Sequence, residues 1–206
     1  VNIDWIDSET FNGNLNQLDN FDGVLVPGGF GTRGSEGIID TATYTLEKNI
    51  PYLGICFGFQ LAAIAFGRKI CNLENANSTE IIADTKNPII DLLPEQKDET
   101  DMGGSLRLGA NEIKINQDSL AYKIYNSDKI SKRHRHRYEF NTDYRDEFLK
   151  KGMIFSGESD NGKRMEILEI PTHKLFLGVQ FHPEFNSRPG FPEDVFKTFV
   201  TAASSK

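Results

Sequence analysis

The segment Gly54–Gly58 reads Gly-Ile-Cys-Phe-Gly and separates an apolar run of strand length, Pro51–Ile55, from a helix-compatible run, Gln60–Phe66. A Gly-x-Cys-x-Gly turn between a strand and a helix has the form of a nucleophile elbow, with cysteine in the place that serine takes in hydrolases. The glycines relieve crowding where the two backbones meet. The turn therefore predicts an α/β fold with Cys56 at the carboxyl end of a parallel strand, where such sheets bind ligands.

A second strand–loop–helix unit comes before this turn. Asp22–Val26 is an apolar run of strand length that ends in proline and glycines, and Glu36–Lys48 has helix-compatible composition. Both strand runs are apolar throughout rather than alternating, which is typical of parallel strands that are buried on both faces. We predict a central, mostly parallel sheet flanked by helices.

The second half of the chain is rich in strands. The segment from 81 to 104 is expected to be mostly loop because it contains two prolines, several acidic residues and a glycine pair. A helix is expected from Pro192 to the polar tail. The expected strands are Ser105–Leu108, Asn111–Ile115, Arg133–Phe140, Met153–Glu158, Arg164–Ile170 and Phe176–Phe181.

The length, the cysteine content and the charge of the chain limit the kinds of partner and compartment that it can have. With 206 residues and 38% hydrophobic content, the chain can bury one continuous core, and we expect one domain over residues 1–206. The two cysteines, Cys56 and Cys71, show no disulfide spacing, which favours a reducing, cytoplasmic compartment. No apolar run approaches the ~18 residues that span a bilayer, so no membrane partner is expected. The net charge of −7 disfavours nucleic acid as a partner.

His182-Pro183-Glu184 directly follows the apolar strand predicted at Phe176–Phe181, so the histidine is expected at a strand end near Cys56. Residues two apart in extended chain point the same way, and Glu184 can then orient His182 as a base. A lone His-x-Glu is more often a surface pair or part of a metal site. Its combination with the elbow favours a Cys56–His182–Glu184 triad, without a metal. The helix after Cys56 is expected to favour the thiolate.

The run Gly29–Gly34 satisfies the Gly-x-Gly-x-x-Gly pattern of dinucleotide-binding folds. That interpretation requires an acidic residue at the end of the second strand, where this chain has Gly54–Cys56. An oxyanion hole is favoured instead, in which the backbone N–H groups of Gly29 and Phe57 converge on the charge that develops at an attacked carbonyl. A plain surface turn is the alternative.

The stretch Arg133–Glu139 reads Arg-His-Arg-His-Arg-Tyr-Glu, which in an extended strand places the arginines on one face and the histidines on the other. Recognition of a substrate carboxylate, a nucleic-acid patch and a metal site are the competing interpretations. The patch is short and the chain is acidic, so carboxylate recognition is favoured. Asn75–Glu80 is by itself expected to be a loop.

Three segments together resemble the class I glutamine amidotransferases: residues 27–31, 54–60 and 180–185. Within that family, residues 75–80, 107–109 and 133–139 resemble the amidotransferase domain of cytidine triphosphate (CTP) synthases. The resemblance implies the flavodoxin-like architecture of the family and hydrolysis of L-glutamine to glutamate and ammonia by Cys56, His182 and Glu184. The residues that it implies for holding glutamine are Gly29, Phe57, Gly58, Phe59, Gln60, Glu80 and Arg137.

The resemblance also implies a longer protein. An N-terminal synthase domain, which this chain lacks, would use the ammonia, ATP and Mg²⁺ to aminate UTP to CTP, with GTP as an allosteric activator and with a homo-oligomeric assembly. We expect no cofactor in the amidotransferase domain itself. The residues do not place the GTP site, and the loop from Gly31 to Gly37 is the first place to look for it. The resemblance also implies a further strand and helix before Val1.

Other functions stay open at this point. The nearest enzymatic alternatives are a glutaminase subunit of another amidotransferase and a γ-glutamyl peptidase on the same elbow. A non-catalytic regulatory domain could keep the same fold. A nucleic-acid-binding module would use Arg133, Arg135 and Arg137.

Overall fold

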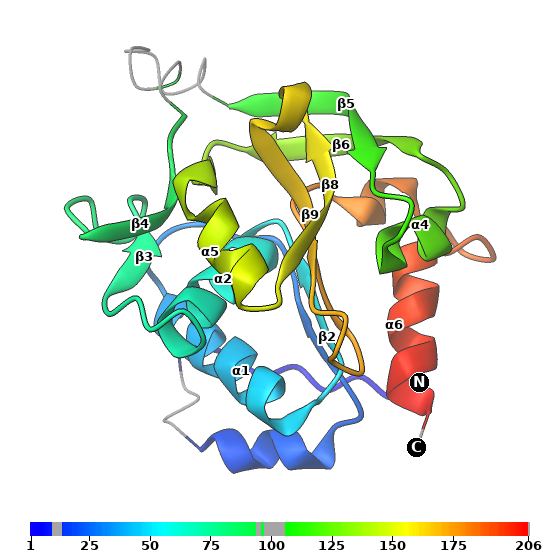
Figure 1. Cartoon of the computed structure of the whole chain (residues 1–206). Helices are drawn as coiled ribbons and strands as arrows, with labels where there is room; N and C mark the ends of the chain where they lie inside the picture. The colour runs from blue at the N-terminus through cyan, green and yellow to red at the C-terminus, as the bar shows by residue number, and fades with distance from the viewer. Residues whose placement is uncertain (10–13, 94–95, 97–105, 206) are drawn as a thin grey trace.

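A seven-stranded sheet forms the centre of the computed structural model, which describes residues 1–9, 14–93, 96 and 106–205 (Figure 1). The strand order is β1-β2-β10-β9-β8-β5-β6. In this order the strands are β1 (Val24–Val26), β2 (Tyr52–Ile55), β10 (Phe176–Val179), β9 (Arg164–Glu169), β8 (Ile154–Ser159), β5 (Arg107–Ile115) and β6 (Lys129–His136).

The direction of the strands follows from their pairing. β2 lies between β1 and β10 and is parallel to both. The remaining neighbours are antiparallel, so only β9 and β5 run against the other five strands of this sheet. The predicted α/β fold with a mostly parallel sheet is confirmed.

Helices cover both faces of the sheet (Figure 1). Tyr52 and Leu53, adjacent on β2, belong to separate buried clusters because successive strand residues point to opposite faces. The cluster around Tyr52 includes α1 (Ser35–Lys48), α2 (Phe57–Lys69) and α5 (Arg145–Lys150). The cluster around Leu53 includes α4 (Leu120–Tyr125) and α6 (Asp194–Ser204). No helix in the described part of the chain is long and apolar enough to cross a membrane.

A small second sheet, with the order β3-β4-β7, corrects two loop predictions. β3 (Ala76–Ser78) lies within the stretch expected to be a loop, and β4 (Asn87–Asp91) lies within the segment from 81 to 104. β4 forms because Ile89 and Ile90 are fully buried. Pro88 pairs with Asn77 next to a register irregularity, which accommodates a residue without an N–H group. Of the predicted loop, residues 94–95 and 97–104 lie outside the described residues.

Several predicted boundaries were also wrong. β5 is one strand rather than two, because Gly109 continues it with φ of +87°, and Ser105 lies outside the described residues. The strand predicted at Arg133–Phe140 is two strands, β6 and β7 (Glu139–Phe140). The sequence prediction missed α4 and α5, which have six residues each and too few turns for a clear periodicity.

The elbow after β2 has the backbone that its glycines predict. Cys56 has φ of 51° and ψ of −97°, a strained conformation for a residue with a side chain. A Cβ atom on Gly54 would lie 2.5 Å from the carbonyl oxygen of Gly58, and one on Gly58 would lie 2.5 Å from the carbonyl oxygen of Val26. Both contacts are with backbone, so the turn tolerates only glycine at these two positions.

Replacement of Gly58 therefore tests the packing of the elbow. We expect Gly58→Ala to lower the free energy of unfolding by at least ~2 kcal/mol, because the new methyl group overlaps backbone that cannot move aside. Gly67→Ala in the same helix is the control, since its new Cβ would meet only side-chain carbons, the nearest at 3.3 Å. Urea unfolding measures both, and equal effects would contradict this account.

Candidate active site

Three loops meet at the carboxyl end of the sheet, because β1, β2 and β10 are neighbours that run in one direction. Gly28 follows β1, Cys56 follows β2 and His182 follows β10. A Cβ atom on Gly28 would lie 2.8 Å from Cε1 of His182 and 3.8 Å from Cβ of Cys56. The histidine ring and the cysteine side chain therefore meet over Gly28, although they are far apart in the sequence.

Glu184 holds His182 in one tautomer. Nδ1 of His182 lies 2.6 Å from Oε1 of Glu184, and the 3₁₀ turn η4 (Pro183–Asn186), rather than the extended chain expected from sequence, brings the two together. Burial opposes ionisation of Glu184, yet the hydrogen bond from His182 holds its pKa below the ordinary value. The carboxylate accepts, so Nδ1 carries the proton. Nε2 is then a buried acceptor with no hydrogen-bond partner among the described residues.

The sulfur of Cys56 is almost fully enclosed. Burial raises the pKa of the Cys56 thiol to about 12, the N–H of Phe57 and the amide of Gln180 oppose that shift, and Glu184 adds to it. The N–H of Phe57 at the start of α2 lowers the pKa of the thiol, in the direction expected for a helix N-terminus, but burial outweighs it. The thiol needs a nearby base to lose its proton, and Nε2 of His182 can accept it.

The glycine-rich loop packs against the start of α2. A Cβ atom on Gly29 would lie 3.3 Å from the ring of Phe57, so the backbones of the two proposed oxyanion donors lie close together. The N–H of Gly31 donates to Oε1 of Glu80 at 3.0 Å, which ties the loop to the segment after β3. Burial raises the pKa of Glu80, while the Gly31 N–H and the charge of Arg137 oppose the shift.

The other residues predicted to hold glutamine differ in where their side chains lie. Gln60 is buried and donates through Nε2 to the carbonyl of Tyr138 at 2.9 Å. Phe57 and Phe59 belong to the hydrophobic core, and a Cβ atom on Gly178 of β10 would lie 3.2 Å from the ring of Phe59. Phe59 can therefore contribute to a site only through its backbone.

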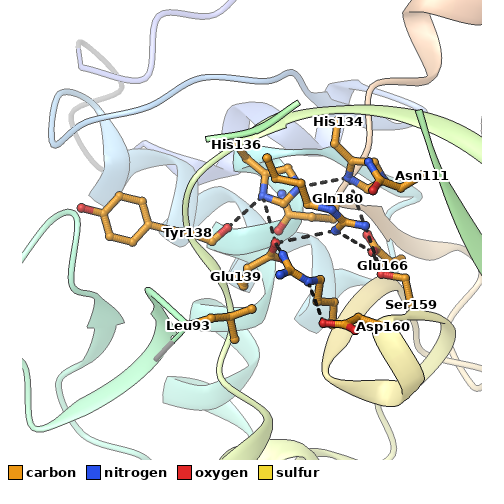
Figure 2. A network of polar contacts seen from close by, with 12 residues as sticks. Leu93, Asn111, His134, His136, Tyr138, Glu139, Ser159, Asp160, Glu166 and Gln180 are labelled. Carbon is orange, nitrogen blue, oxygen red and sulfur yellow. Dashed lines mark hydrogen bonds and ion pairs between the residues drawn. The ribbon is translucent and has the colours of Figure 1, made fainter. Parts of the chain in front are cut away.

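A network of buried charges lies beside these residues (Figure 2). Nη1 of Arg107 is 2.6 Å from Oε1 of Glu166, and Nη1 of Arg164 is 2.9 Å from Oε1 of Glu139. Both glutamates are fully buried. Burial raises the pKa of Glu139 to about 7 against the opposing charges of the two arginines.

Two histidines of β6 complete this network. His134 and His136 point into the protein while Arg133 and Arg135 are exposed, which confirms the predicted alternation for these four residues. Burial, reinforced by the charge of Arg107, lowers the pKa of His134 to about 2 and of His136 to about 3. Both rings are therefore neutral near pH 7.

Sequence reasoning assigned no role to Gln180, Arg107 or Glu166. Gln180 is fully buried, its backbone N–H donates to the carbonyl of Glu166 at 2.8 Å, and its Nε2 is 3.7 Å from Sγ of Cys56. Gln180 is the single polar residue of the otherwise apolar run Phe176–Phe181, and Glu166 lies between Met165 and Ile167. That pattern is the available signal, because a polar side chain at a core position needs a buried partner.

The contact of His182 with Gly28 can be tested directly. We expect Gly28→Ala to displace the histidine ring, because the new methyl group overlaps it at 2.8 Å. Alkylation of Cys56 by iodoacetamide near neutral pH should slow by roughly tenfold or more, as expected for loss of a general base. Peptide mass spectrometry measures the rate, and Gly67→Ala is the control for the same substitution elsewhere. An unchanged rate in folded Gly28→Ala would show that His182 does not assist Cys56.

The buried charges predict a pH-dependent defect. Arg107→Met leaves the Glu166 carboxylate without its arginine, which should cost about 3–5 kcal/mol of unfolding free energy near pH 8. Burial already raises the pKa of Glu166 and Arg107 opposes that shift, so removing the arginine raises it further. Protonated Glu166 needs no cation, and the defect should therefore shrink towards pH 5 and grow as pH rises.

Urea unfolding at both pH values measures this defect. The control is Arg135→Met, which removes an exposed arginine of β6 and should change stability by less than ~0.5 kcal/mol. A defect in Arg107→Met that is equal at the two pH values would contradict the charge pairing with Glu166.

Comparisons with known proteins identify the family of this chain. The family model for glutamine amidotransferase class-I matches residues 1–202. The CTP synthases of Archaeoglobus fulgidus and Halalkalibacterium halodurans are each 52% identical, over 98% and 100% of this chain. The chain spans 38% and 39% of their lengths. The solved glutaminase domain of Trypanosoma brucei CTPS, with bound acivicin, is 36% identical, with a TM-score of 0.92 over 100% of this chain and 81% of that one. The chain therefore belongs to the class I glutamine amidotransferases.

Proposed function

We propose that this chain hydrolyses L-glutamine to glutamate and ammonia, with Cys56 as nucleophile, His182 as general base and acid, and Glu184 as the group that orients His182. The observation that carries the proposal is the meeting of the Cys56 elbow and the His182–Glu184 pair over Gly28. Membership of the amidotransferase family supports glutamine as the substrate.

The first half of the reaction forms a thioester. Nε2 of His182 takes the thiol proton of Cys56, and the sulfur attacks the side-chain amide carbon of glutamine. The negative charge that develops on the amide oxygen is stabilised by the N–H groups of Gly29 and Phe57. The C–N bond then breaks, His182 returns the proton to the leaving nitrogen, and ammonia departs from a γ-glutamyl thioester on Cys56.

The second half of the reaction regenerates the enzyme. A water molecule gives a proton to Nε2 of His182 and attacks the thioester carbon, and the C–S bond breaks. Glutamate leaves, and the proton on His182 returns to the sulfur. Glu184 stays ionised throughout and stabilises the imidazolium, because its pKa lies below its ordinary value in this site.

The amino-acid end of glutamine needs two opposite charges. The family resemblance implies that Glu80 and Arg137 hold glutamine, and the two are close enough for the charge of Arg137 to affect the pKa of Glu80. In this proposal Arg137 binds the α-carboxylate and Glu80 the α-ammonium group. Gln60 and the backbone of residues 57–59 contact the side-chain amide.

The whole reaction extends beyond this chain. We propose that the ammonia serves an N-terminal synthase domain of a longer, homo-oligomeric cytoplasmic protein, which aminates UTP to CTP with ATP and Mg²⁺ and is activated by GTP. The share of about 38% that the chain represents of its CTP synthase relatives leaves room for such a domain. None of the steps of glutamine hydrolysis given above uses these cofactors.

Labelling with a glutamine-derived diazoketone tests the proposed nucleophile. We expect one label on Cys56, protection by excess glutamine and no label in Cys56→Ser. Glu184→Gln should slow labelling by at least roughly a hundredfold, as expected when a triad histidine loses its orienting carboxylate. Intact-mass and peptide mass spectrometry measure the label. Cys71→Ser, which changes the other buried cysteine, should label like the wild type. A label on another residue, or none on folded protein, would sink the proposal.

A further inference from the structure

Gln180 lies between the nucleophile and the residue that the family pattern assigns to glutamine binding. Its Nε2 is 3.7 Å from Sγ of Cys56, and its Oε1 is 3.3 Å from Nε2 of Gln60. The side chain is fully buried at the end of β10, so water does not compete for either contact. The direction of its amide decides whether the sulfur meets a donor or an acceptor.

One backbone carbonyl fixes that direction. The oxygen of Tyr138 can only accept, so the Gln60 atom 2.9 Å away must be the amide nitrogen. The same nitrogen has a second hydrogen, which it presents to Gln180. Gln180 must therefore accept with its Oε1, because two amide nitrogens would both be donors and could not form a hydrogen bond. Its own N–H group is then directed at Cys56.

A hydrogen bond from His136 of β6 supports this orientation of the amides. Nδ1 of His136 lies 3.1 Å from the same Tyr138 oxygen, so Nδ1 carries a proton and donates. A neutral His136 then accepts at Nε2, where Nδ1 of His134 lies 3.0 Å away. The Tyr138 carbonyl is therefore held by two donors and is not free to turn. The proton positions of His134, His136, Gln60 and Gln180 all follow from that one acceptor.

We propose that Gln180 is a further catalytic residue, whose Nε2–H donates to the Cys56 sulfur and stabilises its thiolate, and that Gln60 and the Tyr138 carbonyl hold the amide in this orientation. The inference rests on the proposed role of Cys56 as nucleophile. It explains how a desolvated sulfur can hold a negative charge next to carboxylates. A hydrogen bond to the charged form favours that form, and the effect is largest where water is excluded.

The charged groups that face Cys56 come from several elements. His182 follows β10, Glu184 belongs to η4, and Glu139 belongs to β7. Both carboxylates oppose the thiolate and His182 can take its proton. A change at Gln180 leaves these three groups in place, so its effect on the titration of Cys56 can be separated from theirs.

The test is the pH profile of Cys56 alkylation by iodoacetamide, which needs no bound glutamine. Gln180→Met keeps a similar shape but removes the donor. We expect the apparent pKa of Cys56 to rise by about one unit, so that the alkylation rate falls about tenfold near pH 7.5, where only a small fraction of the sulfur is ionised. Coincident profiles for wild type and Gln180→Met would overturn the proposal.

Two further variants and one control separate the effect of charge from the effect of orientation. Gln180→Glu should shift the profile in the same direction, and Gln117→Glu, at an exposed glutamine, is the matched control for the added charge. Gln60→Met releases the orientation of Gln180 and should give a smaller shift of the same sign. No shift in folded Gln60→Met would overturn the role of Gln60.

If the Gln180 variants do not fold, an NMR titration of the wild-type protein still tests the proposal. The side-chain amide proton of Gln180 should move downfield in the NMR spectrum as Cys56 ionises, and an unchanged shift would overturn the proposal. Failure of the proposed role of Gln180 can be distinguished from failure of the proposed function. If the wild-type protein folds but the glutamine-derived diazoketone does not label Cys56, the proposed function fails. If labelling occurs with a profile independent of Gln180, only the role of Gln180 fails.

Discussion

The close approach of the Cys56 turn to β1 excludes water from the sulfur. The backbone packs so closely at Gly54 and Gly58 that a side chain on either residue would overlap a carbonyl oxygen. The strained φ of Cys56 directs its side chain towards Gly28. The same packing that positions the nucleophile also raises the pKa of its thiol to about 12, with burial as the main cause. The rest of the site must therefore offset a desolvation cost that the fold itself creates.

Two sets of groups offset that cost in this account. His182, oriented by Glu184, takes the proton, and the N–H groups of Phe57 and Gln180 favour the charged sulfur. The buried pair of Arg107 with Glu166 links β5 to β9, and the buried pair of Arg164 with Glu139 links β9 to β7. Removing one partner of such a pair is costly, because it leaves a buried charge without compensation.

The sequence allowed prediction of the α/β fold and of the meeting of Cys56 with His182, because strand ends and a Gly-x-Cys-x-Gly turn are local signals. It did not predict β4, since Pro88 and acidic neighbours resemble a loop until the burial of Ile89 and Ile90 is known. The direction of the Gln180 amide also escaped prediction. It depends on Gln60 and on the carbonyl of Tyr138, which are distant in sequence and become neighbours only in the folded chain.

The most direct test of the central claim is to trap the covalent intermediate. Protein mixed with glutamine and quenched in acid should carry the mass of one γ-glutamyl group on Cys56, and Cys56→Ala should show neither the adduct nor glutamate release. Glutamate release that persists in Cys56→Ala, or an adduct on a different residue, would contradict the account.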